Sequence, residues 1–267
     1  MGNLRRNNPH TPGFRNFELR TQPSQNPFGP QLAERRNTVH LAEIEIPTTE
    51  ITDLFEDFVR DASFPCVGAK SALNKGQMHF VVADDIRSAW DDLRIWPKIV
   101  SLANSYRNDP VLFQTLVVIF RNHGTLSERR FERAVWDRLQ SLSDKDEWLG
   151  QSVDPRISSD PEDPHFAVSF GGEAFFVVGL HPNASRPARR FSYPTMVFNL
   201  HNQFETLRNE GRYDPLRDTI LKRDKALAGT TNPMLAQHGD ASAARQYSGR
   251  RVEDGWVCPY SRKSNAA

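Results

Sequence analysis

The strongest constraint on the fold is a nearly continuous apolar run near the middle of the chain. Residues Val111 to Phe120 read VLFQTLVVIF, and β-branched side chains make up much of the run. A strand with one face in water would alternate apolar and polar side chains, and this run does not. The pattern therefore predicts a central strand that is buried on both faces.

Two kinds of periodicity surround this strand. Short runs rich in β-branched and aromatic side chains predict further strands, and longer amphipathic runs predict helices. The expected strands are 78–82, 166–170, 174–180 and 195–200, and the expected helices are 48–62, 88–108, 125–142, 201–211 and 214–228. Because strands and helices do not alternate strictly, the fold class is predicted as α/β (α+β), a single domain with a mixed β-sheet flanked by helices.

Local signals refine four of these elements. Pro97 predicts a kink or a split in its helix, and the pair Gly171-Gly172 between two strand runs predicts a hairpin or a β-bulge. Thr125-Leu-Ser-Glu128 has the spacing of a capping box, which predicts that a helix begins there. Four side chains of the first helix are predicted to share one face at the i, i+3, i+4, i+7 spacing: Ile51, Leu54, Phe55 and Phe58.

Composition narrows the compartment and the partners. The 34 Lys and Arg residues nearly cancel the 33 Asp and Glu residues, so a net charge of +1 gives no general attraction to nucleic acid or to an anionic membrane. No window approaches 18 consecutive apolar residues, and the N-terminus lacks the apolar segment of a secretory signal. Two cysteines cannot form a disulfide scaffold, so we expect a cytoplasmic protein.

The two ends of the chain differ in composition from the middle. Residues 1–38 are rich in Asn, Pro, Arg and Gln and have few aliphatic side chains, which predicts a disordered arm. We expect one folded domain at 39–262 and a short tail at 263–267.

Most motifs with tight spacing are missing. The sequence has no phosphate loop, no GxGxxG, no CxxC, no HExxH and no GxSxG. These absences argue against a nucleotide fold, a structural zinc site and a serine hydrolase.

Four features nevertheless suggest a chemical site. Cys66, in Phe-Pro-Cys-Val-Gly, is either an inert buried thiol or a thiolate that binds iron or acts as a nucleophile. His181 follows an apolar strand and is either a satisfied side chain or a site residue. Glu173 lies in an apolar run, where a carboxylate needs a hydrogen bond or a cation. Three arginines in HPNASRPARRF form either a solvated loop or a clamp for anions: Arg186, Arg189 and Arg190.

The strings FPCVGAKSALNKG, FAVSFGGEAFFVVGLHPNASRPARRF, RQYSGR and WVCPY resemble the YqcI/YcgG family. The closer resemblance is to its haem-dependent guanidine N-hydroxylases, a branch that includes enzymes of D-cycloserine and guanitoxin biosynthesis. It extends from about Thr49 to Tyr260 and leaves out the N-terminal arm.

The resemblance implies a haem-dependent monooxygenase with haem b and iron as cofactor. Its substrate would be L-arginine or a related guanidine, its oxidant O2 or peroxide, and its product an N-hydroxyguanidine. The sequence has no flavin or iron–sulfur signature, so the electrons would come from a separate reductase or from peroxide. A homodimer is possible. The alternative is a non-catalytic haem-binding or redox-sensing protein, and a third hypothesis is an interaction protein without haem.

The resemblance also suggests roles for single residues. Cys66 is the first choice for the axial iron ligand, since a thiolate favours O–O cleavage; His181 is the alternative and Cys258 the third choice. Glu173 is expected to bind the substrate guanidinium and, with His181, to take part in catalysis. Many members of the family have a larger residue at the position of Gly68, so this chain is expected to leave more room beside the iron.

The remaining candidates lie around the same expected pocket. Arg186, Arg189 and Arg190 are expected to pair with the haem propionates or with a substrate carboxylate. Tyr247 and Arg250, in RQYSGR, are expected to close the pocket over the substrate.

Overall fold

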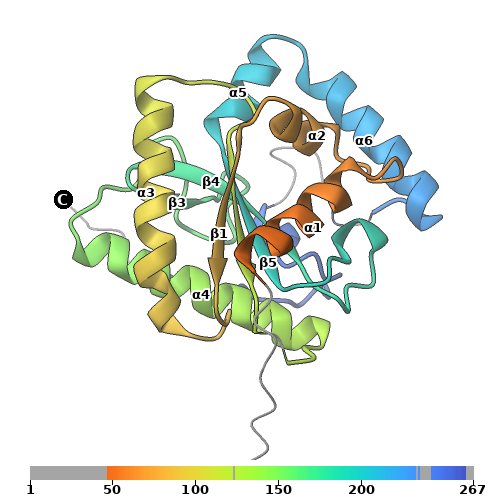
Figure 1. The fold of residues 1–267 in the computed structure, drawn as a ribbon. Helices are drawn as coiled ribbons and strands as arrows, with labels where there is room; N and C mark the ends of the chain where they lie inside the picture. The colour runs from red at the N-terminus through yellow and green to blue at the C-terminus, as the bar shows by residue number, and fades with distance from the viewer. Residues whose placement is uncertain (1–46, 123, 233, 235–241, 263–267) are drawn as a thin grey trace, which may run out of the picture. The chain divides into compact units, whose positions relative to one another are not determined.

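A computed structural model describes residues 47–122, 124–232, 234 and 242–262. They form a five-stranded sheet with the order β1-β2-β5-β4-β3 (Figure 1). The strands are β1 (Met78–Ala83), β2 (Thr115–Phe120), β3 (Val168–Phe170), β4 (Glu173–Leu180) and β5 (Thr195–Leu200). β1 and β2 are parallel and every other pair is antiparallel, so the predicted mixed sheet is confirmed.

Helices cover both faces of this sheet. The α-helices are α1 (Thr48–Arg60), α2 (Val67–Asn74), α3 (Asp92–Asn108), α4 (Glu128–Trp148), α5 (Asn202–Asn209), α6 (Tyr213–Ala228) and α7 (Ala244–Tyr247). Two 3-10 turns, η1 (Ala89–Asp91) and η2 (Pro187–Arg189), complete the described elements. Figure 1 shows α3 and α4 on one side of the sheet and α1, α2 and α6 on the other.

The apolar run forms β2, and all six of its residues are buried. Val118 packs into the core beneath α3 and α4, whereas Val117 packs into the core beneath α1 and α2. Burial on both faces is therefore confirmed, but the strand begins only at Thr115. Phe113 has a φ of 74°, outside the strand region, and its N–H donates to a side chain instead of to a neighbouring strand.

Two expectations about the helices need correction. In α1 the buried positions are Ile51, Phe55 and Val59, one every four residues, while Leu54 is 46% exposed. α4 begins at Glu128, and the hydroxyl of Ser127 accepts the N–H of Arg130. Ser127 is thus the N-cap, and the capping box that the sequence suggests does not form.

The glycine pair closes a hairpin between β3 and β4, as predicted. Phe170 pairs with Glu173, and Gly171 and Gly172 have φ values of 58° and 79°. Two consecutive positive φ values are those of a tight hairpin turn, which glycine adopts without a steric penalty. Pro97 lies inside α3, which continues past it to Asn108.

The described residues belong to one unit, Glu45–Ala267. Among them, no helix has both the length and the apolar composition needed to cross a bilayer. The predicted arm at 1–38 and the tail at 263–267 lie outside the described residues.

Candidate functional site

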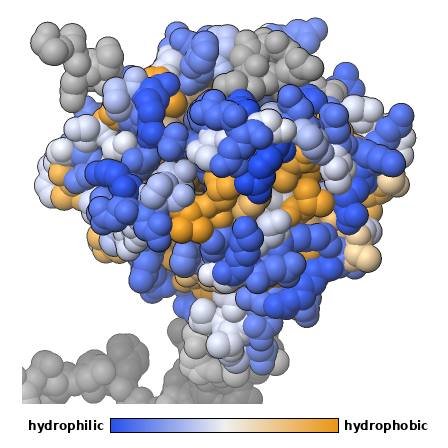
Figure 2. Space-filling view, turned by 90° about the horizontal axis from the view of Figure 1, so that it is seen from above, coloured by the Kyte–Doolittle hydropathy of each residue, from blue (hydrophilic) through white to orange (hydrophobic). Residues whose placement is uncertain are grey.

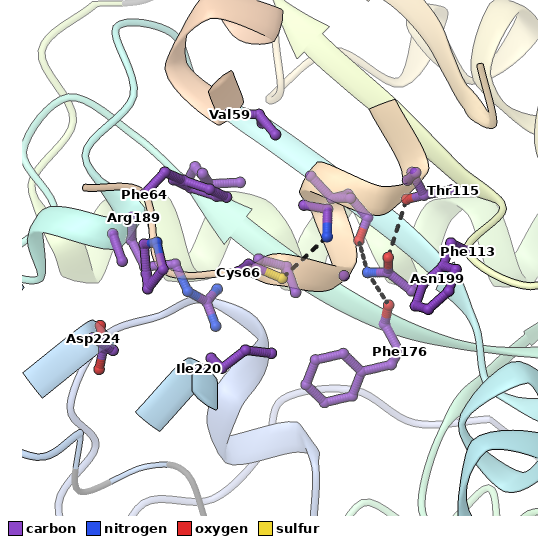
Figure 3. A pocket seen from close by; sticks show the side chains of 18 of the residues that line it. Val59, Phe64, Cys66, Phe113, Thr115, Phe176, Arg189, Asn199, Ile220 and Asp224 are labelled. Carbon is purple, nitrogen blue, oxygen red and sulfur yellow. Dashed lines mark hydrogen bonds between the residues drawn. The ribbon is translucent and has the colours of Figure 1, made fainter. Parts of the chain in front are cut away.

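A cavity of about 270 Å³ lies on the face of the sheet that carries α1, α2, α5 and α6. Its walls are mostly apolar, with Phe64, Phe113, Phe176 and Ile220 among them (Figure 3). Figure 2 views the molecule from the end where α2, α5 and α6 lie in Figure 1, and it shows hydrophobic surface in a hollow between hydrophilic side chains. A partly open apolar cavity with few polar groups is the usual form of a small-molecule site.

Cys66 contributes its thiol to the cavity wall. It is the N-cap of α2 and is extended, with φ −77° and ψ 97°, and its Sγ accepts the N–H of Ala69 at 3.4 Å. Burial raises the pKa of this thiol, while the N–H groups of Ala69 and Gly68 and the charge of Arg189 lower it in part. The sequence thus places a sulfur atom at the positive end of a helix, where negative charge is stabilised.

Gly68 keeps the space beside this sulfur open. A Cβ built on Gly68 would lie 3.8 Å from the Sγ of Cys66 and 3.9 Å from the ring of Phe113. A larger side chain at this position would extend from that point, next to the thiol.

Arg189 reaches the same wall from η2, and Figure 3 shows its side chain extending toward Cys66. Its Nη1 donates to the carbonyl of Gly179 at 3.0 Å, and its Nη2 donates to that of Gln246 at 3.5 Å. The pKa of Arg189 is lowered to about 10, mainly by burial and to a lesser extent by the charge of Arg186, while Cys66 and Asp224 raise it in part. The guanidinium is therefore held by neutral carbonyl oxygens beside the thiol.

Arg186 and Asp224 form an ion pair in the cavity wall. The Nε of Arg186 donates to Oδ2 of Asp224 at 3.0 Å, and its Nη2 donates to the same oxygen. Nη2 also donates to the carbonyl of Thr230 at 2.7 Å. Asp224 is only 4% exposed, so this pair lies within the protein and joins α6 to the turn before η2.

A small polar group lies elsewhere in the cavity wall. The hydroxyl of Thr115 donates to Oδ1 of Asn199 at 3.1 Å, and the Asn199 amide donates to the carbonyl of Phe176 at 3.3 Å. The Gln203 side chain accepts the N–H of Phe113 at 2.7 Å. The sequence patterns did not single out Thr115, Asn199, Gln203 or Asp224. The asparagine inside the apolar strand TMVFNL is a signal in the sequence for a polar group in the cavity wall.

Glu173 lies outside this cavity. It faces the other side of β4 from Phe176 and Val178, whose side chains line the cavity. Its two carboxylate oxygens accept from Arg107 at 3.3 Å and from Arg156 at 2.6 Å. The apolar run around Glu173 predicts a hydrogen bond or a cation for its carboxylate, and the protein's own arginines provide both.

His181 and Cys258 also do not line the cavity. The His181 ring stacks on Phe131 of α4, with centroids 4.3 Å apart, and its Nδ1 is buried without a hydrogen bond. Burial lowers the pKa of His181. Cys258 belongs to the core beneath α3 and α4, and burial raises the pKa of its thiol to about 12. Of the three candidate iron ligands, the structure places only Cys66 at the cavity.

The other three candidates are engaged elsewhere. The Tyr247 hydroxyl donates to the carbonyl of Phe175 at 3.1 Å. Arg250 donates from Nε to Glu132 at 2.7 Å, and Arg190 donates from Nε to the carbonyl of Ala184 at 3.0 Å. None of the three is among the described residues that line the cavity.

The residues at the cavity fit a haem in their chemistry. Haem iron needs one axial side chain from the protein, and Cys66 offers a thiol. Apolar walls suit the macrocycle, and Arg186 and Arg189 are the cations within reach of anionic groups. The cavity volume lies just below the ~300–1,000 Å³ range of small-molecule sites, so a ligand as large as a haem also needs the open side. Among the residues described, no three His, Cys, Asp or Glu side chains cluster as a metal site.

A comparison with protein-family models gives a match to the YqcI/YcgG family over residues 55–261. The chain belongs to the YqcI/YcgG family. The match covers β1 to β5 and every residue that forms the cavity wall named above. No curated protein and no solved structure matches the chain.

Proposed function

We propose that this YqcI/YcgG protein is a haem-dependent oxygenase that N-hydroxylates a guanidine, such as that of L-arginine. The observation that carries the proposal is the Cys66 thiol in the wall of an apolar cavity, at the N-terminus of α2 and beside Arg189. The motif around it, FPCVGA, also belongs to the resemblance with the haem-dependent branch of the family.

A haem held by the Cys66 thiolate would supply the oxygen-activation chemistry that oxygen insertion into an N–H bond requires. The chain's own residues prepare the sulfur for that role. The Ala69 N–H and the Arg189 charge both favour the thiolate over the thiol. Burial among the apolar side chains opposes them and raises the pKa of the Cys66 thiol overall, so the thiolate would form when the sulfur binds iron.

The proposal includes an external source of electrons. We infer that a separate reductase with O2, or peroxide alone, supplies the oxidising equivalents. The cations Arg186 and Arg189 would hold the haem propionates or a substrate carboxylate.

The first test is the absorption spectrum of the full chain purified with haem, both oxidised and reduced under CO. We expect a Soret band and a ferrous–CO band typical of thiolate ligation in the wild type. Cys66→Ala should lose that CO band, and Cys258→Ala, the matched control at the buried thiol outside the cavity, should keep it. Retention of the band in Cys66→Ala would refute Cys66 as ligand, and loss of haem in His181→Ala alone would move the assignment to His181.

One observation favours the non-catalytic alternative. The carboxylate expected to bind the guanidinium, Glu173, is held by Arg107 and Arg156 on the opposite face of the sheet. A haem protein that senses redox state would not need a guanidinium partner. A Soret band that shifts with L-arginine, and an N-hydroxyguanidine product detected by mass spectrometry, would favour the oxygenase. A haem spectrum that does not respond to guanidines would favour the sensor.

A further inference from the structure

A guanidinium inside an apolar cavity needs hydrogen-bond acceptors, because an unpaired charge is costly to desolvate, and a carboxylate is the acceptor that also balances its charge. Asp224 is the carboxylate among the described residues that line the cavity. It acts electrostatically on Arg189, as does Cys66, so Asp224 and the thiol both lie near that guanidinium. Figure 3 shows Asp224 and Cys66 with Arg189 between them.

Among the described residues, the donors to the Asp224 carboxylate use only one of its two oxygens. Both donors from Arg186 go to Oδ2, and no described residue donates to Oδ1. A guanidinium binds a carboxylate best when two N–H groups meet the two oxygens in parallel. The wall of the cavity thus already binds one guanidinium, and it retains an acceptor for a second.

We propose that Asp224 is the residue that receives the substrate's guanidinium, and that Arg186 occupies part of this position in the free protein. The inference deepens the proposed function and rests on it for the substrate class. Arg186 also has the Thr230 carbonyl as a partner, so it keeps a hydrogen bond when Asp224 turns toward a ligand.

This arrangement predicts selection by charge. L-Citrulline replaces the guanidinium of L-arginine by a neutral urea of nearly the same shape. A buried carboxylate gains a charge-assisted bond only from the cation, so the wild type should bind L-arginine at least tenfold more tightly than L-citrulline.

The experiment compares three variants of the full chain by calorimetric titration with L-arginine, each with and without haem. Asp224→Asn should weaken L-arginine binding at least tenfold. Asp218→Asn, the matched control on an exposed position of the same helix, should bind within twofold of wild type. Glu173→Gln should also bind within twofold, because its carboxylate lies outside the cavity. Equal binding by Asp224→Asn and wild type, or no binding by wild type, would overturn the inference.

A second measurement covers the case in which Asp224→Asn does not fold. Arg186→Ala removes the resident guanidinium and leaves Asp224 without its partner. Millimolar ethylguanidinium should then raise the melting temperature of Arg186→Ala, whereas N-ethylurea should not. The absence of this difference would overturn the inference.

The two proposals fail in different ways. If the wild type forms no Soret band but binds L-arginine through Asp224, the haem proposal fails and the guanidinium site stands. If the Soret band forms and shifts with L-arginine equally in wild type and Asp224→Asn, the oxygenase stands and the role of Asp224 is refuted.

Discussion

Replacing Gly179 by alanine should destabilise the protein through two crowded contacts. A Cβ at this position in β4 would lie 2.9 Å from Cε1 of Phe131 and 3.0 Å from the carbonyl oxygen of Tyr247. Nonbonded carbon atoms prefer separations of about 3.5–4.0 Å, so the ring has to retreat by more than about 0.5 Å. It has little freedom to do so, because it is fully buried and stacks on His181.

Overpacking of this kind costs about 1–3 kcal/mol. For a domain of this size, each kcal/mol lowers the melting temperature by about 2–4 °C. We expect Gly179→Ala to lower both the melting temperature and the midpoint of urea unfolding, and to leave the m-value unchanged. The Gly179 carbonyl also anchors Arg189, so the same shift should disturb the wall of the cavity beside Cys66.

The control is Gly255→Ala, at a glycine whose added Cβ would meet nothing within 4 Å. Its free energy of unfolding should stay within about 0.5 kcal/mol of wild type. If Gly179→Ala and Gly255→Ala have the same urea midpoint, the argument from the crowded contacts is refuted.

Three further predictions test the fold. Ser127→Ala should lower the free energy of unfolding in urea by about 1 kcal/mol and Thr125→Ala should leave it almost unchanged, since Ser127 caps α4. A larger loss in Thr125→Ala than in Ser127→Ala would instead support the capping box. Arg138→Met should cost about 3–5 kcal/mol, because it leaves Oδ1 of the fully buried Asp92 without its cation while Lys145 stays on Oδ2, and a loss below about 1 kcal/mol would contradict this. Burial raises the pKa of Asp154, but hydrogen bonds from a guanidinium and from backbone N–H groups outweigh it, and the pKa is lowered overall. Its carboxylate therefore stabilises the fold above the ordinary pKa of Asp and loses this effect as the pH falls, so urea midpoints should fall less steeply below about pH 4 in Asp154→Asn than in wild type.

Much of the fold can be predicted from local sequence patterns. The run before Phe120 predicts a doubly buried strand because only β-branched and apolar side chains fit between two layers. The pair Gly171-Gly172 predicts the hairpin because both positions need positive φ values. The prediction of which face of α1 is buried was partly wrong. Leu54 and Val59 both fit a helical spacing with Ile51 and Phe55, and only the neighbouring helix and sheet decide which of the two side chains is buried.

The candidate site shows the limit of this reasoning. Alternation along β4 places Glu173 and Val177 on one face and Phe176 and Val178 on the other, and this parity is visible in the sequence. Which face borders the cavity depends on how α1, α2 and α6 pack, and that packing placed Glu173 away from Cys66.

The sequence by itself determined the strands, the hairpin and the thiol motif, because each depends on residues within a few positions of one another. The tertiary structure alone decided which of the candidate residues share a cavity. Arg186 and Asp224 are 38 positions apart and belong to different elements. Their pairing follows from the packing of α6 against η2, and no local pattern encodes such a long-range contact.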